Sequence, residues 1–236
     1  MLHNSSTALH SEHTHKRTNN TTTNLMKRVD YSYEPILEIK NEYHIVVLPN
    51  VYPPSEDTWL TVESIRELAK EGHRFNIGID IGCGCGILSL YLTEICRKVV
   101  ATDINPVACF NTLVNAKLNY VDIEVICTDT LEALRNLRVD IVVSNPPYLP
   151  DSMRPRSWIE YSWYGGVDGR EIINKVLRYA AKYLRPGGYL VLTQSSYSNI
   201  EKTVSILRRS GFRITRFTKR SYQFFEDIIC ITAVRL

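Results

Sequence analysis

The 236-residue sequence lacks several features that would place it in other classes of protein. It has no run of about 18 apolar residues, so we expect no membrane-spanning helix. Its first residues (MLHNSSTALHSEHTHKR) lack the apolar segment of a secretory signal, which makes the cytoplasm the expected location. None of its six cysteines forms a C-x2-C pair, so we expect neither a zinc framework nor a disulfide scaffold, and we assign no metal ligands.

An excess of basic charge is also missing from most of the chain. The net charge is +3, and residues 1–28 account for all of it, because they hold four basic side chains and one acidic one. The remaining residues hold 24 basic and 24 acidic side chains. A domain without net positive charge is a poor candidate for a nucleic-acid binder, although a local basic patch remains open. We predict a disordered polar tail at residues 1–28 and one domain at residues 29–236.

Apolar segments of two kinds alternate along this domain. Short apolar runs predict strands at residues 43–48, 75–81, 98–102, 123–127, 139–144, 189–193, 212–218 and 228–234. Segments of helical periodicity predict helices at residues 58–70, 87–97, 105–118, 131–137, 170–183 and 199–210. Near-continuous apolar strands between helices are typical of an α/β fold, with a mostly parallel sheet covered on both faces. Such sheets bind ligands beyond the carboxyl ends of their strands.

A glycine-rich loop, Asp80-Ile-Gly-Cys-Gly-Cys-Gly86, lies at the end of the predicted strand 75–81. Gly82 and Gly84 would let a ligand approach the bare backbone. A dinucleotide site has the spacing G-x-G-x-x-G, whereas here the third glycine comes one residue earlier. The strand also carries its own acid, Asp80, which suits the amino group of a methionine moiety. The loop therefore favours S-adenosylmethionine over a dinucleotide, with a purely structural turn as the alternative.

Two further acids come at the ends of the next two predicted strands. Asp103 is placed to accept hydrogen bonds from ribose hydroxyls, and Asp129 to accept one from an adenine amino group. Either acid alone would be interpreted as a turn residue. Three acids at successive strand ends are a more specific pattern and strengthen the prediction of a cofactor site.

The turn Asn145-Pro-Pro-Tyr148 follows the predicted strand 139–144. A carboxamide or nucleobase nitrogen is a weak nucleophile, because its lone pair is delocalised. The side-chain oxygen of Asn145 and the carbonyl of Pro146 can accept its two N–H bonds and direct the lone pair toward a sulfonium methyl group. Tyr148 can stack on the flat group. The turn predicts methyl transfer to a planar nitrogen, and these residues alone leave amide and nucleobase equally open.

The motifs resemble those of the HemK-type glutamine N5-methyltransferases, in the short archaeal and eukaryotic branch. Residues 51–60 (VYPPSEDTWL) resemble its V-Y-x-P-A-E-D-T/S element, and residues 165–171 (GGVDGRE) its G-G-x-x-G-R-E loop. The similarity covers about residues 45–236, with Ser55 in place of alanine and Cys83 in place of threonine. It implies a class I S-adenosylmethionine-dependent methyltransferase (Rossmann-like) fold, whose seven-stranded sheet is mostly parallel with an antiparallel last strand. It also implies N5-methylation of the glutamine in the Gly-Gly-Gln motif of a class I release factor.

The resemblance, with the glycine-loop argument, assigns roles residue by residue. The candidates for cofactor binding are Thr58, Asp80, Gly82, Gly84, Asp103, Asp129 and Asn145. The candidates for holding the target amide are Asn145, Pro146 and Tyr148, and the acids of the 51–60 element are expected to shape the pocket. The family also implies a small zinc-binding activator subunit that extends the sheet. We expect its docking edge near residues 45–48 or 98–102.

Two other functions remain as alternatives. One is N6-adenine or N2-guanine methylation of nucleic acid, since Asn-Pro-Pro-Tyr serves any flat amino nitrogen. Residues 149–168 carry arginines, tryptophans and tyrosines that suit either a base-stacking platform or a lid over a protein substrate. The other alternative is a scaffold without catalytic activity, which the complete set of motifs argues against. Lysine methylation fits poorly, because an ammonium group must first lose a proton.

Overall fold

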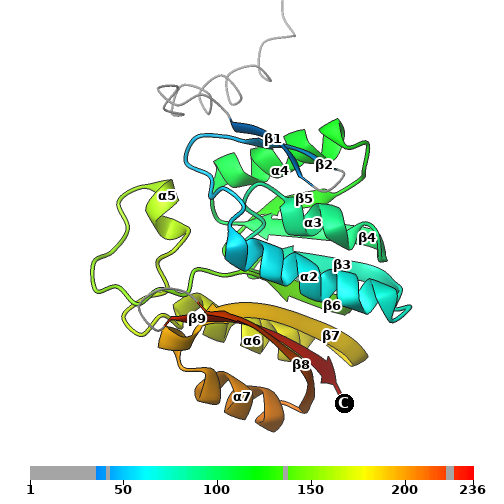
Figure 1. The fold of residues 1–236 in the computed structure, drawn as a ribbon, viewed down its shortest axis with the longest axis vertical. Helices are drawn as coiled ribbons and strands as arrows, with labels where there is room; N and C mark the ends of the chain where they lie inside the picture. Colours follow the sequence, from blue (N-terminus) through cyan, green and yellow to red (C-terminus); the bar gives the residue numbers. More distant parts are fainter. Residues whose placement is uncertain (1–35, 41–42, 135–137, 222–225) are drawn as a thin grey trace, which may run out of the picture.

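The computed structural model describes residues 36–40, 43–134, 138–221 and 226–236, so the predicted tail at residues 1–28 lies outside the described residues. Its centre is a seven-stranded sheet with the strand order β5-β4-β3-β6-β7-β9-β8 (Figure 1). The strands are β3 (Phe75–Ile81), β4 (Cys96–Asp103), β5 (Glu124–Cys127), β6 (Val139–Ser144), β7 (Leu184–Ser195), β8 (Phe212–Ser221) and β9 (Asp227–Arg235).

The direction of the strands confirms the predicted topology. Strands β3 to β7 pair in parallel, whereas β9 is antiparallel to both of its neighbours, β7 and β8. The last strand of the chain is therefore the one that runs against the others. The sheet reverses its strand order beside β3, and this is the place where open α/β sheets bind ligands.

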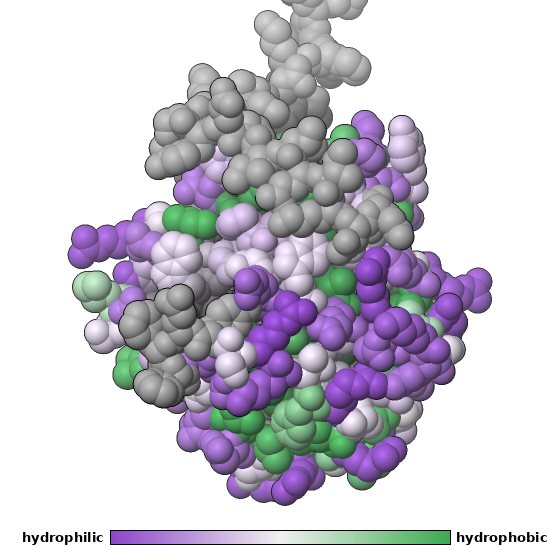
Figure 2. All heavy atoms as spheres, in the orientation of Figure 1, coloured by the Kyte–Doolittle hydropathy of each residue, from purple (hydrophilic) through white to green (hydrophobic). Residues whose placement is uncertain are grey.

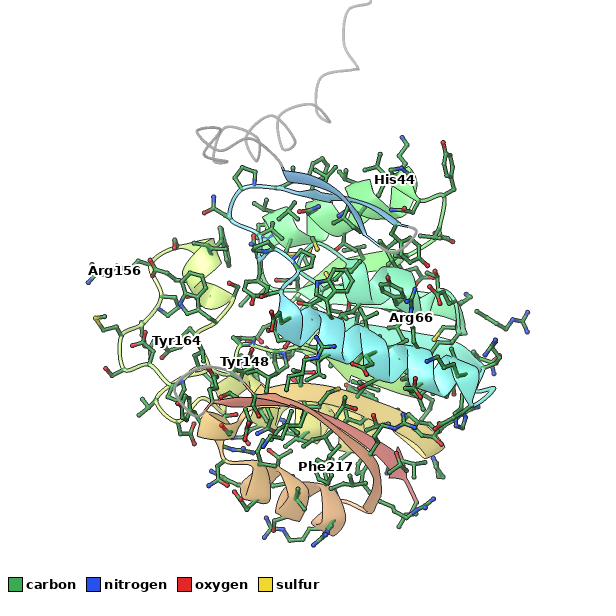
Figure 3. All side chains as sticks on the ribbon, viewed as in Figure 1. His44, Arg66, Tyr148, Arg156, Tyr164 and Phe217 are labelled. Atoms are coloured by element: carbon green, nitrogen blue, oxygen red, sulfur yellow. The ribbon has the colours of Figure 1, made fainter. Side chains whose placement is uncertain are left out.

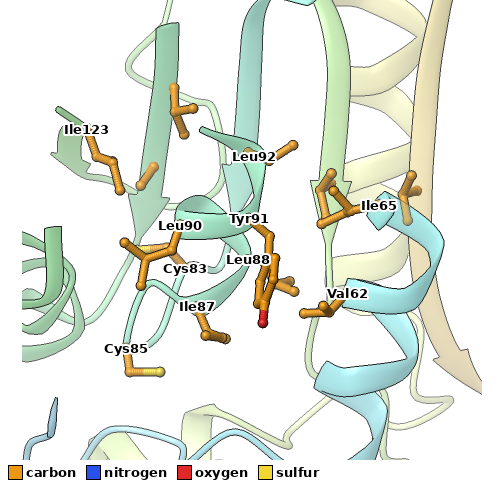
Figure 4. Close-up of a cluster of buried hydrophobic side chains, with 14 of the residues drawn as sticks. Val62, Ile65, Cys83, Cys85, Ile87, Leu88, Leu90, Tyr91, Leu92 and Ile123 are labelled. Atoms are coloured by element: carbon orange, nitrogen blue, oxygen red, sulfur yellow. The ribbon is translucent and has the colours of Figure 1, made fainter. Parts of the chain in front are cut away.

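Helices cover both faces of the sheet. The helices α2 (Glu56–Lys70), α3 (Ile87–Leu92) and α4 (Pro106–Leu118) pack with one cluster of buried apolar side chains, part of which Figure 4 shows around Ile65 and Leu90. The helices α6 (Glu171–Tyr183) and α7 (Ile200–Arg209) pack with a second cluster, which includes Val176 and Leu207. No helix in the described ranges is both long and apolar enough to cross a bilayer.

Several predicted elements have different bounds in the structure. The helix predicted at residues 87–97 ends at Leu92, because residues 93–95 turn and β4 begins at Cys96. Residues 131–134 of the helix predicted at 131–137 form a turn, and residues 135–137 lie outside the described part. The long loop 149–168 contains a one-turn helix, α5 (Trp158–Tyr161), held at its start by the Ser157 hydroxyl.

A strand pair lies outside the main sheet, and the sequence patterns predicted only its second strand, at residues 43–48. Strand β1 (Ile36–Lys40) pairs in antiparallel fashion with β2 (Tyr43–Val47), and this hairpin lies beside α4 in Figure 1. The chain then passes through residues 48–55 into α2, whose N-cap residue is Ser55. The hairpin therefore leads directly into the segment that resembles the V-Y-x-P-A-E-D-T/S element.

Candidate active site

A cleft of about 190 Å³ lies at the carboxyl ends of β3, β4 and β6, as the sequence predicted. Segments that are far apart in the sequence meet there. Its walls include Asn50, Val51, Tyr52, Pro54, Thr58, the glycine loop, Asp103–Asn105, Asp129, Asn145–Pro147 and side chains of the 158–175 region. Of the predicted site residues, Thr58, Gly82, Gly84, Asp103, Asp129, Asn145 and Pro146 line the cleft, whereas Asp80 and Tyr148 do not.

The glycine loop presents bare backbone to this cleft. Gly82 and Gly84 have φ angles of 77° and 55°, which disfavour residues with a side chain. A Cβ atom at either position would meet no described atom within 4 Å, so both glycines face open space. At Gly86, by contrast, a Cβ would lie 2.9 Å from a methyl carbon of Thr112, on α4. The first two glycines therefore leave room for a ligand, and the third lets the loop pack against α4.

Asp103 is oriented by backbone groups at the end of β4. Its carboxylate accepts hydrogen bonds from the N–H groups of Gly84, at 2.9 Å, and Asn105, at 2.8 Å. Burial raises the pKa of Asp103 and these backbone donors act to lower it. A carboxylate fixed in this way on the wall of the cleft suits the predicted contact with ribose hydroxyls.

Asp129 has a partner that no sequence pattern predicted. The Nζ atom of Lys175, on α6, lies 2.5 Å from its Oδ2 atom, and both side chains line the cleft. The ion pair orients the carboxylate and connects the end of β5 to α6. The predicted contact with an adenine amino group would use the remaining lone pairs of Asp129.

Asp80 lies behind the glycine loop and not on the wall of the cleft. Its side chain is 0% exposed, and one of its oxygens accepts a hydrogen bond from the Ser89 hydroxyl at 2.6 Å. Its other oxygen, Oδ1, has no partner among the described residues. Burial raises the pKa of Asp80 to about 7. The carboxylate is thus only half satisfied, and a positive charge in the cleft would stabilise its ionised form.

The orientation of Asn145 is fixed by a second buried acid, Asp57. The Nδ2 atom of Asn145 donates to Oδ2 of Asp57 at 2.9 Å. Because two acceptors cannot hydrogen-bond to one another, this contact forces the Asn145 Oδ1 atom to point the other way. That oxygen has no partner in the described part of the chain, although Asn145 lines the cleft. It is therefore a buried, unsatisfied acceptor on a residue of the cleft wall, which suits the N–H group of a substrate.

Tyr148 shares the same carboxylate. Its hydroxyl donates to Oδ2 of Asp57 at 2.9 Å, and burial together with the Asp57 charge raises the pKa of Tyr148, so it remains a donor. Figure 3 shows Tyr148 between the start of α2 and the loop that carries Tyr164. The aromatic rings on the cleft wall are instead Tyr52, Trp158, Tyr161 and Tyr164. Stacking of Tyr148 on a target amide therefore stays a prediction.

The geometry fits the cofactor that the sequence suggested. Two open glycines leave space against the backbone, and buried oxygens of Asp80 and Asn145 lack partners within the described ranges. These features suit a ligand that has a ribose, a flat base and a positive charge. From the sequence, the acids of the 51–60 element were expected to shape the pocket, but no contact of Asp57 with Asn145 or Tyr148 was predicted, and Lys175 was not singled out. For Asp57 a signal existed in the E-D-T segment, whereas nothing near Lys175 marked it.

Comparisons with known proteins agree with this geometry. Residues 57–158 match the family model of the methyltransferase small domain. A putative protein N5-glutamine methyltransferase from Methanocaldococcus jannaschii is 32% identical over 80% of this chain and 93% of its own length. The methyltransferase HEMK2 of Homo sapiens is 31% identical over 72% of this chain and 84% of its own length.

A solved structure agrees as well. A chain of the E. cuniculi Mtq2–Trm112 complex, described as responsible for methylating the translation termination factor eRF1, superposes with a TM-score of 0.62. It is 25% identical, and the match covers 79% of this chain and 99% of that one. Taken with the sequence relatives, these matches confirm the resemblance drawn from the motifs: the chain belongs to the HemK-type family of protein N5-glutamine methyltransferases.

Proposed function

We propose that this protein transfers the methyl group of S-adenosylmethionine to the side-chain nitrogen of the glutamine in the Gly-Gly-Gln motif of a class I release factor. The observation that carries the proposal is the buried Oδ1 atom of Asn145, which has no partner among the described residues, while Asp57 holds the Nδ2 atom of the same carboxamide. The names of the relatives, which refer to protein glutamine and to eRF1, support the choice of substrate.

The chemistry follows from what the turn can bind. S-adenosylmethionine, when bound, supplies an electrophilic methyl group on a sulfonium. Asn145 Oδ1 and the Pro146 carbonyl accept the two N–H bonds of the target amide, which draws electron density toward the nitrogen and aims its lone pair. The nitrogen bonds to the methyl carbon as the carbon–sulfur bond breaks, and sulfur keeps the electron pair. One of the held protons then becomes acidic and leaves to solvent.

The test is to locate the methyl group. The protein is incubated with S-adenosylmethionine and the release factor of its host, and the product is digested and analysed by mass spectrometry. We expect a single added methyl on the Gly-Gly-Gln glutamine, with a rate that falls at least about 100-fold in Asn145→Ala. A methyl group on another residue would overturn the substrate. Transfer to nucleic acid, with a rate that falls steeply with salt, would favour the nucleobase alternative.

We further propose a small partner subunit, of the zinc-binding activator type that the family implies, and place it at the free edge of β5. Neither edge that the sequence suggested is open. Residues 98–102 belong to β4, which lies between β3 and β5, and residues 45–48 are hydrogen-bonded to α4. Among the described residues, β5 pairs only with β4, so its outer edge can accept a strand from another chain.

Exposed apolar side chains beside this edge support the placement. Helix α4 packs against β4 and β5, and its residues Phe110 and Leu113 are 45% and 48% exposed. They are three residues apart and share one face of the helix. The opposite edge strand, β8, alternates exposed basic residues such as Arg213 and Lys219 with its other side chains. Basic side chains of this kind protect an edge from pairing.

A matched pair of variants tests the partner surface. Phe110→Glu with Leu113→Glu places charge beside β5, whereas Phe217→Glu changes a comparably exposed residue on β8, labelled near the bottom of Figure 3. Figure 2, in the same orientation as Figure 1, shows apolar residues gathered over the lower part of this face. Each form is co-expressed with the host's small zinc-binding activator, and the complex is measured by size-exclusion chromatography. We expect the first variant to lose the complex and the second to keep it. Equal behaviour of the two variants would remove β5 as the interface.

A further inference from the structure

Three asparagines on one face of α4 form an unusual buried stripe. Asn111, Asn115 and the helix-capping Asn119 are spaced by four residues, so their side chains align along the helix. The first two are 0% exposed. Asparagine is a weak helix former and costs free energy when buried without partners. The stripe must therefore be explained by what the carboxamides bind.

Each carboxamide hydrogen-bonds to the backbone of β2. The Oδ1 atoms of Asn111, Asn115 and Asn119 accept from the N–H groups of Leu48, Val46 and His44, at 2.8, 2.9 and 2.8 Å respectively. Their Nδ2 atoms donate to β2 carbonyls at 2.7 to 2.8 Å, from Asn111 and Asn115 to Val46 and from Asn119 to His44. The helix thus offers alternating acceptors and donors, as a neighbouring strand would.

The periods of the two elements explain why this ladder fits. Four residues of helix rise about 6.0 Å and two residues of strand about 6.7 Å, so three successive side chains stay in register with alternate backbone groups. Alternate residues of a strand direct their N–H and C=O groups to the same side. The backbone groups of His44, Val46 and Leu48 point toward α4. The backbone groups of the residues between them are left to pair with β1. Both sides of β2 are therefore hydrogen-bonded.

The same helix also holds the glycine loop. The Nδ2 atom of Asn115 donates to the Cys85 carbonyl at 2.7 Å as well as to Val46, and the Thr112 hydroxyl donates to the Gly84 carbonyl at 3.1 Å. At the start of the helix, Asn105 Nδ2 donates to the carbonyl of Asn50, which lies just after β2. Asn50–Tyr52 and the glycine loop are both walls of the cleft. One helix therefore connects the two walls through a few amide side chains.

We infer that Asn115 is a positioning residue for cofactor binding, because it sets the place of the glycine loop relative to the segment that follows β2. Asn111 contributes through the end of β2 nearest the cleft. Asn119 makes the same kind of contact with β2, at His44. Its side chain has no hydrogen bond to the glycine loop among the described residues, unlike that of Asn115. This inference rests on the proposed function in one respect only, namely that the cleft binds S-adenosylmethionine.

The test compares Asn115→Ala with Asn119→Ala, its matched control on the same helix and strand. Hydrogen exchange of the protein without cofactor reports the ladder directly. We expect faster exchange at the amide of Val46 in the first variant and at the amide of His44 in the second. Calorimetric titration of S-adenosylmethionine is expected to show a dissociation constant raised about tenfold in Asn115→Ala and less than about twofold in Asn119→Ala. The turnover number at saturating cofactor is expected to stay within about twofold of the parent in both.

Equal dissociation constants in the two variants would overturn the inference, as would an unchanged constant in Asn115→Ala despite faster exchange at Val46. If the parent protein itself fails to bind S-adenosylmethionine, it is the proposed function that fails. Should Asn115→Ala not fold, Asn111→Ala takes its place, because Asn111 holds Leu48 beside the cleft wall. The inference is supported if the dissociation constant of S-adenosylmethionine rises about threefold or more in Asn111→Ala and does not change in Asn119→Ala. The reverse order contradicts it.

Discussion

Two buried carboxylates lie behind the walls of the cleft, and their surroundings differ. Both oxygens of Asp57, which is 7% exposed, accept hydrogen bonds from the protein, from Thr58, Asn145 and Tyr148. Asp80 is 0% exposed, and only one of its oxygens has a partner in the described ranges. Asp57 therefore acts on the target side by fixing its neighbours. Asp80 stays incompletely satisfied until positive charge arrives on the cofactor side.

The largest expected effect comes from Asp57→Asn, which changes the acceptor that Asn145 and Tyr148 share. An asparagine at position 57 can present an amide N–H where Asn145 and Tyr148 need an acceptor, so the Asn145 carboxamide loses its fixed orientation. We expect the turnover number at saturating cofactor to fall about 100-fold and the dissociation constant of S-adenosylmethionine to stay within about threefold. Single-turnover methyl transfer to the release factor measures the first quantity. A parallel loss of cofactor binding would contradict the division between the two acids.

The second prediction concerns pH and the cofactor side. Burial raises the pKa of Asp80 to about 7, so below pH 7 a cationic ligand must first displace a proton from the carboxyl group. We expect the affinity for S-adenosylmethionine to fall about tenfold for each pH unit below 7, and Asp80→Asn to abolish this part of the pH dependence. Calorimetric titrations between pH 6 and 8 measure the slope. An identical slope in the parent and in Asp80→Asn would show that another group titrates.

Tyr148→Phe should give a smaller effect on the target side. The substitution removes the hydroxyl that donates to Asp57 at 2.9 Å but keeps the ring. The Asp57 carboxylate keeps its contact with Asn145, so we expect the turnover number to fall only about fivefold to tenfold. Steady-state kinetics at saturating cofactor measure this drop. A loss as large as that of Asp57→Asn would place Tyr148 in direct contact with the substrate.

The smallest expected effect is a gain in stability without cofactor. The pKa of Asp80 is raised from 3.8 to about 7 by folding, so its protonated form stabilises the fold below about pH 4, and this contribution is lost as pH rises through 7. Asp80→Asn removes the buried charge. We expect its melting temperature at pH 8 to exceed that of the parent by roughly 5 °C, with a smaller difference at pH 5.5. Thermal unfolding followed by circular dichroism measures both, and a lower melting temperature at pH 8 would contradict the account.

The sequence predicted the parts of the site that are local in the chain. The strand-end positions of Asp103 and Asp129, the open glycines and the Asn145–Tyr148 turn follow from patterns a few residues long, and they meet because parallel strands end at the same edge. The contacts that orient them could not be predicted in this way. Asp57 and Asn145 are 88 residues apart, and Lys175 and Asp129 are 46 residues apart. Such pairs depend on how α2 and α6 pack, which periodicity does not specify.

In the fold as well, the features that depend on contacts between distant residues could not be predicted from local patterns. The parallel direction of β3 to β7 follows from the alternation of strands and helices, whereas the antiparallel last strand was implied by the family resemblance. The hairpin β1–β2 was only half predicted: the pattern at residues 43–48 indicated β2 but not β1. The contacts of β2 with Asn111 and its neighbours on α4, more than 60 residues away, could not be predicted from local patterns. The early end of α3 at Leu92 depends on where β4 must begin to pair with β3, and no residue near 92 is a strong helix breaker.

If Asp80 serves the cofactor and Asp57 the target, a single pair of titrations separates the two acids. S-adenosylmethionine is titrated calorimetrically into Asp80→Asn and Asp57→Asn at pH 7.5, in the same buffer. The account predicts a dissociation constant raised at least about thirtyfold in Asp80→Asn and nearly unchanged in Asp57→Asn, since loss of one buried charge contact is typically worth about 2 kcal/mol or more. Equal dissociation constants in the two variants would contradict it.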